Sequence, residues 1–242
     1  MSSRGAALIT GGSRRIGRTL VRACASLGFD VAIHCRLADD DAHAAAAEVR
    51  GLGRKATLLI ADLRHEAEIA PLVGLAEAEL GPVTLLVNSA SVFEDETFAD
   101  MNRASWDLHM ETNLRAPLVL AQAFARRLPA DRHGMILNLL DQRVMNPSPA
   151  FFSYALSKSA LWDATRMLAK DLAPRIRVNA VGPGPVLRSI HQTEQDFADE
   201  AAATPLQRAV DPEEIAQAMI YFIDAPSVTG QMLIVDAGQH LS

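Results

Sequence analysis

Short apolar runs alternate with longer segments of helical periodicity along the whole chain, and this alternation is the feature that most restricts the fold. The apolar runs lie at residues 6–10, 31–35, 56–61, 83–87, 135–140, 176–181 and 232–235. Such runs, separated by helix-length segments, are typical of buried parallel strands joined by right-handed crossover helices. The sequence therefore predicts the α/β class: one doubly wound domain over residues 1–242, with a seven-stranded parallel sheet and helices on both faces.

The charge distribution favours a small-molecule partner. Across 242 residues the net charge is −6, and the Arg and Lys residues are scattered, so neither a nucleic-acid face nor a membrane-binding patch is indicated. Cys24 and Cys35 belong to no C-x-x-C motif or Cys/His cluster, which argues against a disulfide framework or a metal site. No apolar run approaches ~18 residues and no basic, apolar leader opens the chain, so we expect a cytoplasmic protein.

Tyr154 and Lys158 are the strongest candidates for catalytic chemistry. They stand four residues apart at the start of a helical pattern over 154–173, so they share one helix face. An ammonium near a phenol is expected to lower its pKa from the reference of about 10, which suits acid/base catalysis near neutral pH. The alternative is a packed tyrosine beside a solvated lysine.

The first strand leads into a glycine turn. Residues 10–17 read Thr-Gly-Gly-Ser-Arg-Arg-Ile-Gly and precede a helical pattern that ends at Gly28. Glycines let the backbone approach a pyrophosphate, and the N-terminus of the following helix offers it free N–H groups. The turn therefore indicates a nucleotide site, although glycine-rich turns also serve plain strand-to-helix connections.

The end of the second strand indicates which nucleotide binds. An NAD-preferring fold places an acid about 20 residues after the glycine turn, and this chain has Arg36 there. A guanidinium suits a 2′-phosphate, and Arg14 or Arg15 can add charge from the turn. This pattern favours NADP, with a solvated strand-end arginine as the alternative. Residues 39–41 are all Asp and are expected to open the next helix.

Later strands also end in polar or small residues. Asp62 follows the third strand, where it can reach an adenine edge or serve as the N-cap of the next helix. Residues 88–91 read Asn-Ser-Ala-Ser after the fourth strand and leave room for a ligand. Phe93 lies in the acidic loop that follows, and its ring can stack on a flat substrate or pack on the next helix.

Three features stand between the later strands. The helical pattern over 101–128 is interrupted near Asn113, whose amide needs a partner because it competes with the helix backbone. Pro183 and Gly184 lie in a Gly-Pro-Gly-Pro turn that fixes the end of the sixth strand. Residues 187–204, hereafter the flap, are polar with few apolar anchors, and we expect them to be mobile over the site.

Six motifs follow one another in the order found in short-chain dehydrogenases/reductases. They are Thr10-Gly11…Gly17, Asp62, Asn88-Ser89-Ala90, Asn113, Tyr154-x-x-x-Lys158 and Pro183-Gly184. The motifs extend over nearly the whole chain, which therefore resembles this family. The resemblance implies a Rossmann-type fold and an NADPH or NADP cofactor. Together with helices that are apolar on two faces, it also implies a homotetramer.

Three departures from the usual family pattern resemble its pteridine reductase branch. Asp141 replaces the serine thirteen residues before the tyrosine, Arg15 replaces the middle glycine of the turn, and residues 88–91 replace Asn-Asn-Ala-Gly. By this resemblance, NADPH delivers hydride to a C=N bond of a dihydropterin or folate. Tyr154 would supply the proton, and Phe93 would stack the pterin against the nicotinamide.

The resemblance also implies roles for the other site residues. Lys158 would hold the nicotinamide ribose and lower the pKa of Tyr154, and Asn113 would anchor a water chain behind Lys158. Asp141 would orient Tyr154 and a ring nitrogen, or share in protonation. The expected catalytic residues are Asn113, Asp141, Tyr154 and Lys158. Expected substrate contacts are Arg15, Ser91, Phe93, Asp141 and Tyr154. Expected cofactor contacts are Gly11, Ser13, Arg14, Arg15, Ile16, Gly17, His34, Arg36, Asp62, Leu63, Asn88, Ser89, Ala90, Tyr154, Lys158, Pro183 and Gly184.

Two other functions stay open on the sequence alone. In an ordinary carbonyl reductase, such as a 3-oxoacyl reductase, Asp141 would be incidental and would pair with Arg143 or cap a turn. A nucleotide-sensing scaffold would turn over no substrate, and the intact Tyr154 and Lys158 pair argues against it. The flap sequence carries no pattern that selects among pterin and folate side chains.

Overall fold

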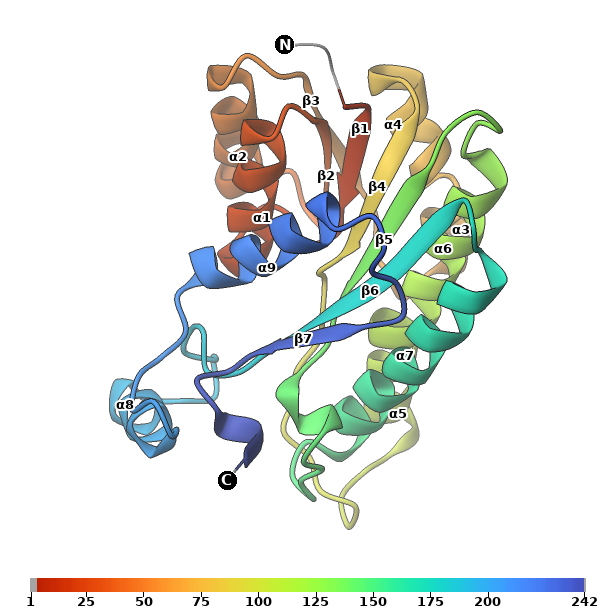
Figure 1. Cartoon of the computed structure of the whole chain (residues 1–242). Coiled ribbons are helices and arrows are strands. Elements are labelled where there is room, and N and C mark those ends of the chain that lie inside the picture. The colour runs from red at the N-terminus through yellow and green to blue at the C-terminus, as the bar shows by residue number, and fades with distance from the viewer. Residues whose placement is uncertain (1–3, 242) are drawn as a thin grey trace.

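Seven parallel strands form the centre of the protein (Figure 1). This computed structural model describes residues 4–241, and its strand order is β3-β2-β1-β4-β5-β6-β7. The strands are β1 (Ala6–Ile9), β2 (Asp30–Cys35), β3 (Ala56–Ile60), β4 (Val83–Asn88), β5 (Gly134–Leu139), β6 (Ile176–Pro183) and β7 (Met232–Val235). Every neighbouring pair is parallel, so the predicted doubly wound α/β fold is confirmed.

Helices cover both faces of this sheet (Figure 1). One face carries α1 (Arg15–Ser26), α2 (Asp40–Gly51) and α9 (Pro212–Asp224). The other face carries α4 (Leu72–Leu80), α6 (Ala116–Arg127) and α7 (Phe152–Asp171). The remaining α-helices are α3 (Glu66–Ile69), α5 (Arg103–Met110) and α8 (Glu194–Ala203).

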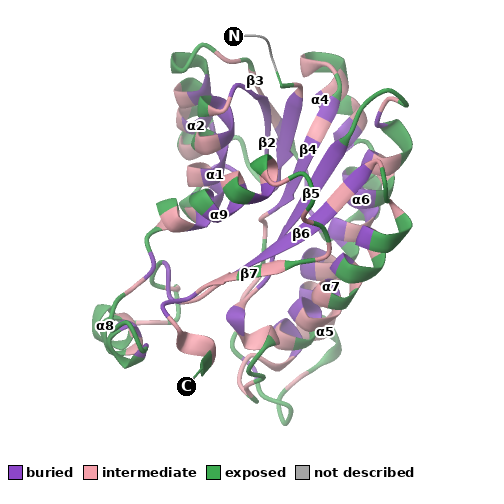
Figure 2. Cartoon of the chain, viewed as in Figure 1, coloured by how far each residue is buried: buried purple, intermediate pink, exposed green. Residues whose placement is uncertain are grey.

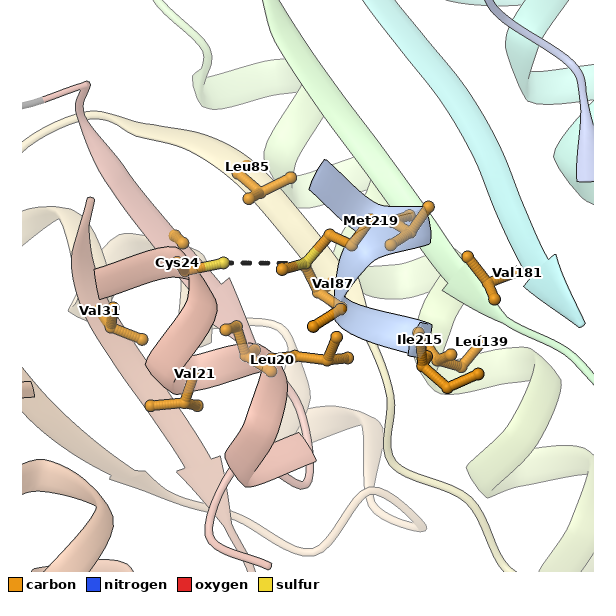
Figure 3. Close-up of a cluster of buried hydrophobic side chains, with 14 of the residues drawn as sticks. Leu20, Val21, Cys24, Val31, Leu85, Val87, Leu139, Val181, Ile215 and Met219 are labelled. Atoms are coloured by element: carbon orange, nitrogen blue, oxygen red, sulfur yellow. Dashed lines mark hydrogen bonds between the residues drawn. The ribbon is translucent and has the colours of Figure 1, made fainter. Parts of the chain in front are cut away.

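Residues of the central strands alternate between two hydrophobic cores. In β1, Ala7 and Ile9 belong to the core under α1 and α9, whereas the other two residues of the strand belong to the core under α4 and α6. All four are fully buried, because a parallel sheet is covered on both faces (Figure 2). In the first core, Cys24 of α1 lies 3.8 Å from the sulfur of Met219 on α9 (Figure 3).

The predicted helix over 101–128 is divided into three segments. Between α5 and α6 the chain forms a π-helix, η1 (Glu111–Arg115), which contains the buried Asn113. Pro117 lacks the N–H that an α-helix would donate to the carbonyl of Asn113 four residues back. The predicted interruption near Asn113 therefore has a backbone cause.

Three details differ from the sequence-based predictions. The flap contains α8, which was not predicted, although Thr193 and Asp196 form a capping box at its start. Pro71 separates α3 from α4, whereas the helical pattern after Leu63 predicts one continuous helix to Leu80. Asp62 does not cap the next helix, since the N-cap position of α3 belongs to His65. Within residues 4–241, no helix combines the length and the apolar character that crossing a bilayer requires.

Candidate active site

A cavity of about 760 Å³ opens at the carboxyl edge of the sheet. The glycine turn, the strand ends, the start of α7 and the flap form its walls. Of the predicted site residues, Asn88 and Asn113 do not border it. The others do: Gly11, Ser13, Arg14, Arg15, Ile16, Gly17, His34, Arg36, Asp62, Leu63, Ser89, Ala90, Ser91, Phe93, Asp141, Tyr154, Lys158, Pro183 and Gly184. The fold thus brings residues from the whole chain to one cavity.

A buried histidine supports the glycine turn. Nδ1 of His34 accepts a hydrogen bond from the N–H of Gly11 at 3.3 Å, so Nε2 donates to the carbonyl of Ala61 at 3.1 Å. Burial lowers the pKa of His34, which favours the neutral ring that these two bonds require. Gly17 admits no side chain, because a Cβ there would lie 2.1 Å from the carbonyl oxygen of Gly11. His34 therefore holds the turn at Gly11.

The start of α1 and the end of β4 face each other across this turn. The N-terminus of α1 has no side-chain cap, so its first N–H groups are free for an anion. Oγ1 of Thr10 accepts hydrogen bonds from the N–H groups of Ser89 and Ala90, each at 3.0 Å. Thr10 therefore joins β1 to β4 at the switch in strand order, where open α/β sheets bind nucleotides.

The three arginines near the turn have different partners. Arg14 forms ion pairs of 2.6 Å with each of two aspartates at the start of α2. Arg15 donates to the carbonyl oxygens of flap residues 187 and 188 at 3.0 and 2.9 Å. Arg36 is exposed and forms no hydrogen bond or ion pair with any residue from 4 to 241. Arg36 is therefore the arginine best placed to bind a phosphate without breaking an existing contact.

Two predicted cofactor residues have partners within the protein. The Asp62 carboxylate accepts hydrogen bonds from the side chain and the backbone N–H of Arg64, and these bonds lower its pKa to about 2. Asn88 donates to Asn138 at 2.8 Å, and Asn138 donates to Thr165 on α7 at 2.9 Å. Asn88 therefore links β4, β5 and α7 behind the cavity.

Asp141 joins Tyr154 to an arginine. The Tyr154 hydroxyl donates to Oδ2 of Asp141 at 2.7 Å, and the Arg143 guanidinium lies 3.2 Å from the same oxygen. The backbone N–H of Arg143 donates to Oδ1 at 2.9 Å. Both the predicted bond to Tyr154 and the alternative pairing with Arg143 are therefore present. No local pattern in the sequence indicates that they occur together.

The predicted lowering of the Tyr154 pKa is wrong for this structure. Burial raises the pKa of Tyr154 well above 10, and the charge and hydrogen bond of Asp141 raise it further, whereas Arg143 lowers it. Lys158 donates from Nζ to the carbonyl of Leu139 at 2.8 Å and lies 5.7 Å from the centre of the tyrosine ring. The ammonium thus shares a helix face with the phenol, as predicted, but does not contact its hydroxyl. Burial lowers the pKa of Lys158 to about 8, against the opposing effect of Asp141.

Asn113 fastens the loop that follows β4. Its Nδ2 donates to the carbonyl of Val92 at 2.9 Å and to the hydroxyl of Ser157 at 3.2 Å. Its Oδ1 accepts from the N–H of Val92 at 2.8 Å and from Ser91 at 3.3 Å. Asn113 and Lys158 share no hydrogen bond in the described structure, so a water chain between them stays a prediction.

Phe93 belongs to a group of aromatic rings. It stacks on Phe151 with centroids 4.0 Å apart and meets the edge of Tyr154 at 4.7 Å. The Arg143 guanidinium lies 5.5 and 5.4 Å from the two phenylalanine centroids. Phe151 has a φ of +55°, which non-glycine residues rarely adopt. Phe151 was not predicted, because it packs on a ring 58 residues away and follows no motif.

Two contacts attach the flap to the rest of the cavity. Arg15 holds the first, through the carbonyl oxygens of residues 187 and 188. At the second, Nε2 of His191 lies 3.1 Å from the carbonyl of Phe93 and 3.3 Å from the carboxylate of Glu94. The flap therefore touches both the glycine turn and the aromatic group.

Comparisons with known proteins agree with this architecture. A family model described as enoyl-(acyl carrier protein) reductase matches residues 11–240. Nodulation protein G of Rhizobium sp. (strain N33) is 33% identical over 237 residues, which are 96% of this chain and 95% of that protein. The 3-oxoacyl-[acyl-carrier-protein] reductase FabG of Staphylococcus epidermidis is 28% identical over 240 residues, covering 97% and 98%.

A solved structure is more similar still. The FolM alternative dihydrofolate reductase 1 of Brucella canis, crystallised with NADP, is 45% identical, with a TM-score of 0.96. The match covers 100% of this chain and 96% of that one. The family model, the full-length relatives and the ordered motifs lead to the same conclusion: the chain belongs to the short-chain dehydrogenase/reductase family.

Proposed function

We propose that this oxidoreductase reduces a C=N bond of a pterin or folate, with hydride from NADPH and a proton from Tyr154. The observation that carries the proposal is the 2.7 Å bond between the Tyr154 hydroxyl and the Asp141 carboxylate. A carbonyl reductase needs a neutral donor beside its tyrosine, whereas a carboxylate suits a ring that offers N–H groups. The similarity to the Brucella canis protein, which is named a dihydrofolate reductase, supports the same substrate class.

The cofactor is NADP(H), as the sequence predicts, and the cavity fits it in three ways. Glycine at position 17 lets the start of α1 pack against the turn, because a Cβ there would lie 2.1 Å from the carbonyl oxygen of Gly11. The uncapped start of α1 supplies N–H donors, and Arg36 is free for a 2′-phosphate. The Brucella canis structure holds NADP in the same fold. When bound, this cofactor supplies the hydride.

Each catalytic side chain has a separate role in the proposal. The Tyr154 hydroxyl transfers its proton to a ring nitrogen of the substrate. The Arg143 guanidinium, which lowers the pKa of Tyr154, then offsets part of the repulsion between the resulting phenolate and Asp141. Asp141 accepts a substrate N–H and so orients the ring. Lys158 uses one N–H on Leu139 and keeps its other N–H groups for the nicotinamide ribose.

The proposed substrate contacts are Arg15, Ser91 and Phe93. The 4.0 Å spacing between Phe93 and Phe151 admits no third ring, so a flat substrate must use the opposite face of Phe93 or displace Phe151. Ser91 and Arg15 border the same cavity and offer donors to its polar edges. Arg15 must first release the carbonyl oxygens of the flap.

The variant Asp141→Ser tests the proposal. Removing the carboxylate should reduce the turnover of dihydropterins and dihydrofolate by about 10²-fold or more, because orientation and proton sharing are both lost. NADPH affinity and the fold should be kept. Turnover is followed by the loss of NADPH absorbance, with Asp40→Ser at the exposed start of α2 as the matched control. Unchanged pterin turnover in folded Asp141→Ser would make Asp141 incidental.

A 3-oxoacyl reductase is the second candidate, because the FabG relative spans the same length. NADPH oxidation with a 3-oxoacyl thioester, and with no pterin or folate, would establish that activity instead. A non-catalytic scaffold would oxidise NADPH with neither class. A cytoplasmic location and a homotetramer also stay predictions, and light scattering at micromolar concentration tests the assembly.

A further inference from the structure

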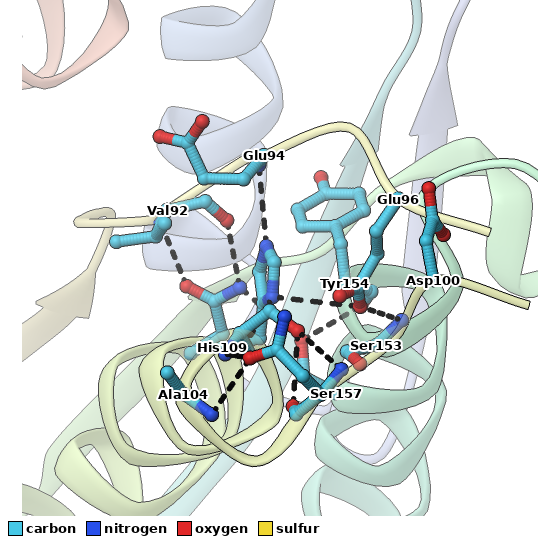
Figure 4. Close-up of polar contacts among 12 residues, drawn as sticks. Val92, Glu94, Glu96, Asp100, Ala104, His109, Ser153, Tyr154 and Ser157 are labelled. Carbon is cyan, nitrogen blue, oxygen red and sulfur yellow. Dashed lines mark hydrogen bonds and ion pairs between the residues drawn. The ribbon is translucent and has the colours of Figure 1, made fainter. Parts of the chain in front are cut away.

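Residues 93–96, in the loop that follows β4, have alternating surroundings. Phe93 and Asp95 border the cavity, whereas Glu94 and Glu96 do not. The backbone of Glu94 and the side chain of Glu96 are instead bonded to neighbouring helices (Figure 4). The side of the loop away from the cavity is therefore held by hydrogen bonds to α5 and α7. These bonds fix the position of the loop backbone and hence of the Phe93 ring.

The first residue that holds the loop is His109, which is fully buried at the end of α5. Its Nε2 accepts the N–H of Glu94 at 3.2 Å, so Nδ1 carries the proton and donates to the carbonyl of Ser105 at 2.9 Å. Both ring nitrogens are thereby used (Figure 4). An apolar side chain at this position would leave the N–H of Glu94 without its partner.

The second such residue is Glu96, which is 6% exposed and attaches the loop to the start of α7. Its carboxylate accepts the N–H of Ser153 at 2.9 Å, and its carbonyl accepts the N–H of Phe152 at 3.1 Å. Burial raises the pKa of Glu96, but hydrogen bonding, including the bond from the backbone N–H of Ser153, brings it below its ordinary value, which favours the carboxylate form. The N-cap residue Phe151 provides no side-chain cap, so Glu96 caps α7 from 57 residues away.

We propose that His109 and Glu96 are positioning residues that fix the Phe93 ring relative to the Tyr154 hydroxyl. Glu96 holds the start of α7, and Tyr154 is the residue after the one it caps. His109 holds the backbone next to Phe93, whose ring meets Tyr154 at 4.7 Å and 80°. The stacking surface and the proton donor are thus attached to each other through the protein interior. This inference rests on the proposed function, in which Phe93 carries the substrate ring.

Hydrogen exchange measured by mass spectrometry tests the attachment without any substrate. In His109→Leu, amide exchange over 91–97 should rise about tenfold, the effect of one lost hydrogen bond of about 1.4 kcal/mol. His109→Gln can again accept the N–H of Glu94 and should restore most of the protection. His43→Leu, on the exposed side of α2, is the matched control. Unchanged exchange in His109→Leu would overturn the inference.

Kinetics then separates positioning from loop stability. The misplaced ring should lower kcat for the pterin about tenfold in His109→Leu, with NADPH affinity unchanged and recovery in His109→Gln. If exchange rises but kcat does not fall, His109 only stabilises the loop and the inference is wrong. If the wild type reduces neither pterins nor folates, the proposed function fails, while the exchange result still decides the attachment. Should His109→Leu not fold, Glu94→Pro removes the same N–H from a partly exposed position.

Discussion

The cofactor end and the substrate end of the cavity are constructed differently. At the cofactor end, a short backbone turn is supported by buried neighbours, as in the bonds of His34 to Gly11 and Ala61. At the substrate end, side chains from distant segments meet, and His191 reaches Phe93 across 98 residues. The shape of the first end lies in the backbone, whereas that of the second depends on side-chain contacts that can open. Substitutions at the cofactor end should therefore change affinity, and those at the substrate end should change turnover.

The largest expected effect lies at the substrate end. Tyr154→Phe removes the proton donor, so pterin reduction should fall by about 10²- to 10⁴-fold, with NADPH affinity unchanged. Turnover is read from NADPH absorbance, and affinity from a fluorescence titration. Tyr221→Phe, at an exposed site on α9, is the control because the chain has two tyrosines. A loss of NADPH affinity as large as the loss of turnover would break the distinction between the two ends.

The next largest effect should appear in the affinity for NADPH and not in turnover. Arg36→Gln removes a charge-assisted contact to the 2′-phosphate that is worth roughly 1.5 to 3 kcal/mol, so NADPH should bind about 10- to 100-fold more weakly. NADH binding should not change. The control is Arg14→Gln, because Arg14 already has two carboxylate partners. Equal weakening of NADPH binding in both variants would mean that Arg36 has no special role.

The same difference explains which parts of the protein the sequence predicts. The strands, the glycine turn and the interruption at Asn113 follow from local periodicity, Gly and Pro, and all are present. The pKa of Tyr154 was predicted in the wrong direction, because the spacing to Lys158 is local whereas burial and the Asp141 bond depend on packing. The Phe151 stack and the remote cap by Glu96 join segments about 60 residues apart, and no local pattern encodes them.

A third prediction concerns stability at the boundary between the ends. Burial lowers the pKa of Lys158 from 10.5 to about 8, so the folded protein binds this proton less tightly than the unfolded chain does. The group therefore destabilises the fold below pH 8, and the penalty vanishes as pH rises from about 8 to 10.5. The shift corresponds to a penalty of about 3 kcal/mol in the free energy of unfolding. Replacing Lys158 would also remove its hydrogen bond to Leu139, which stabilises the fold by about 1 kcal/mol.

Lys158→Met should accordingly raise the free energy of unfolding by about 2 kcal/mol at pH 7 and lower activity. The gain should disappear near pH 10.5, the ordinary pKa of the amine. Urea unfolding without cofactor measures both points, and Lys170→Met on the exposed face of α7 is the control. A gain that persists unchanged at high pH would show that it comes from packing and not from the buried charge.

The smallest effect concerns Arg15, which belongs to the glycine turn but contacts the flap. Its two bonds to the carbonyl oxygens of residues 187 and 188 are exposed, so Arg15→Gln should cost the flap about 1 kcal/mol and raise its amide exchange about fivefold. Arg14→Gln, next in the chain, has no flap contact among residues 4–241 and should leave that exchange unchanged.

The outcome for Arg15 decides where the division between the ends lies. If Arg15→Gln raises the amide exchange of the flap without weakening NADPH binding, the backbone of the glycine turn serves the cofactor site. The Arg15 side chain then serves the substrate end. If NADPH affinity falls and flap exchange does not change, Arg15 is a cofactor residue as the family resemblance implies. The bonds to the flap would then be contacts that give way when NADPH binds, and closing the flap would depend on His191 and its contacts with Phe93 and Glu94.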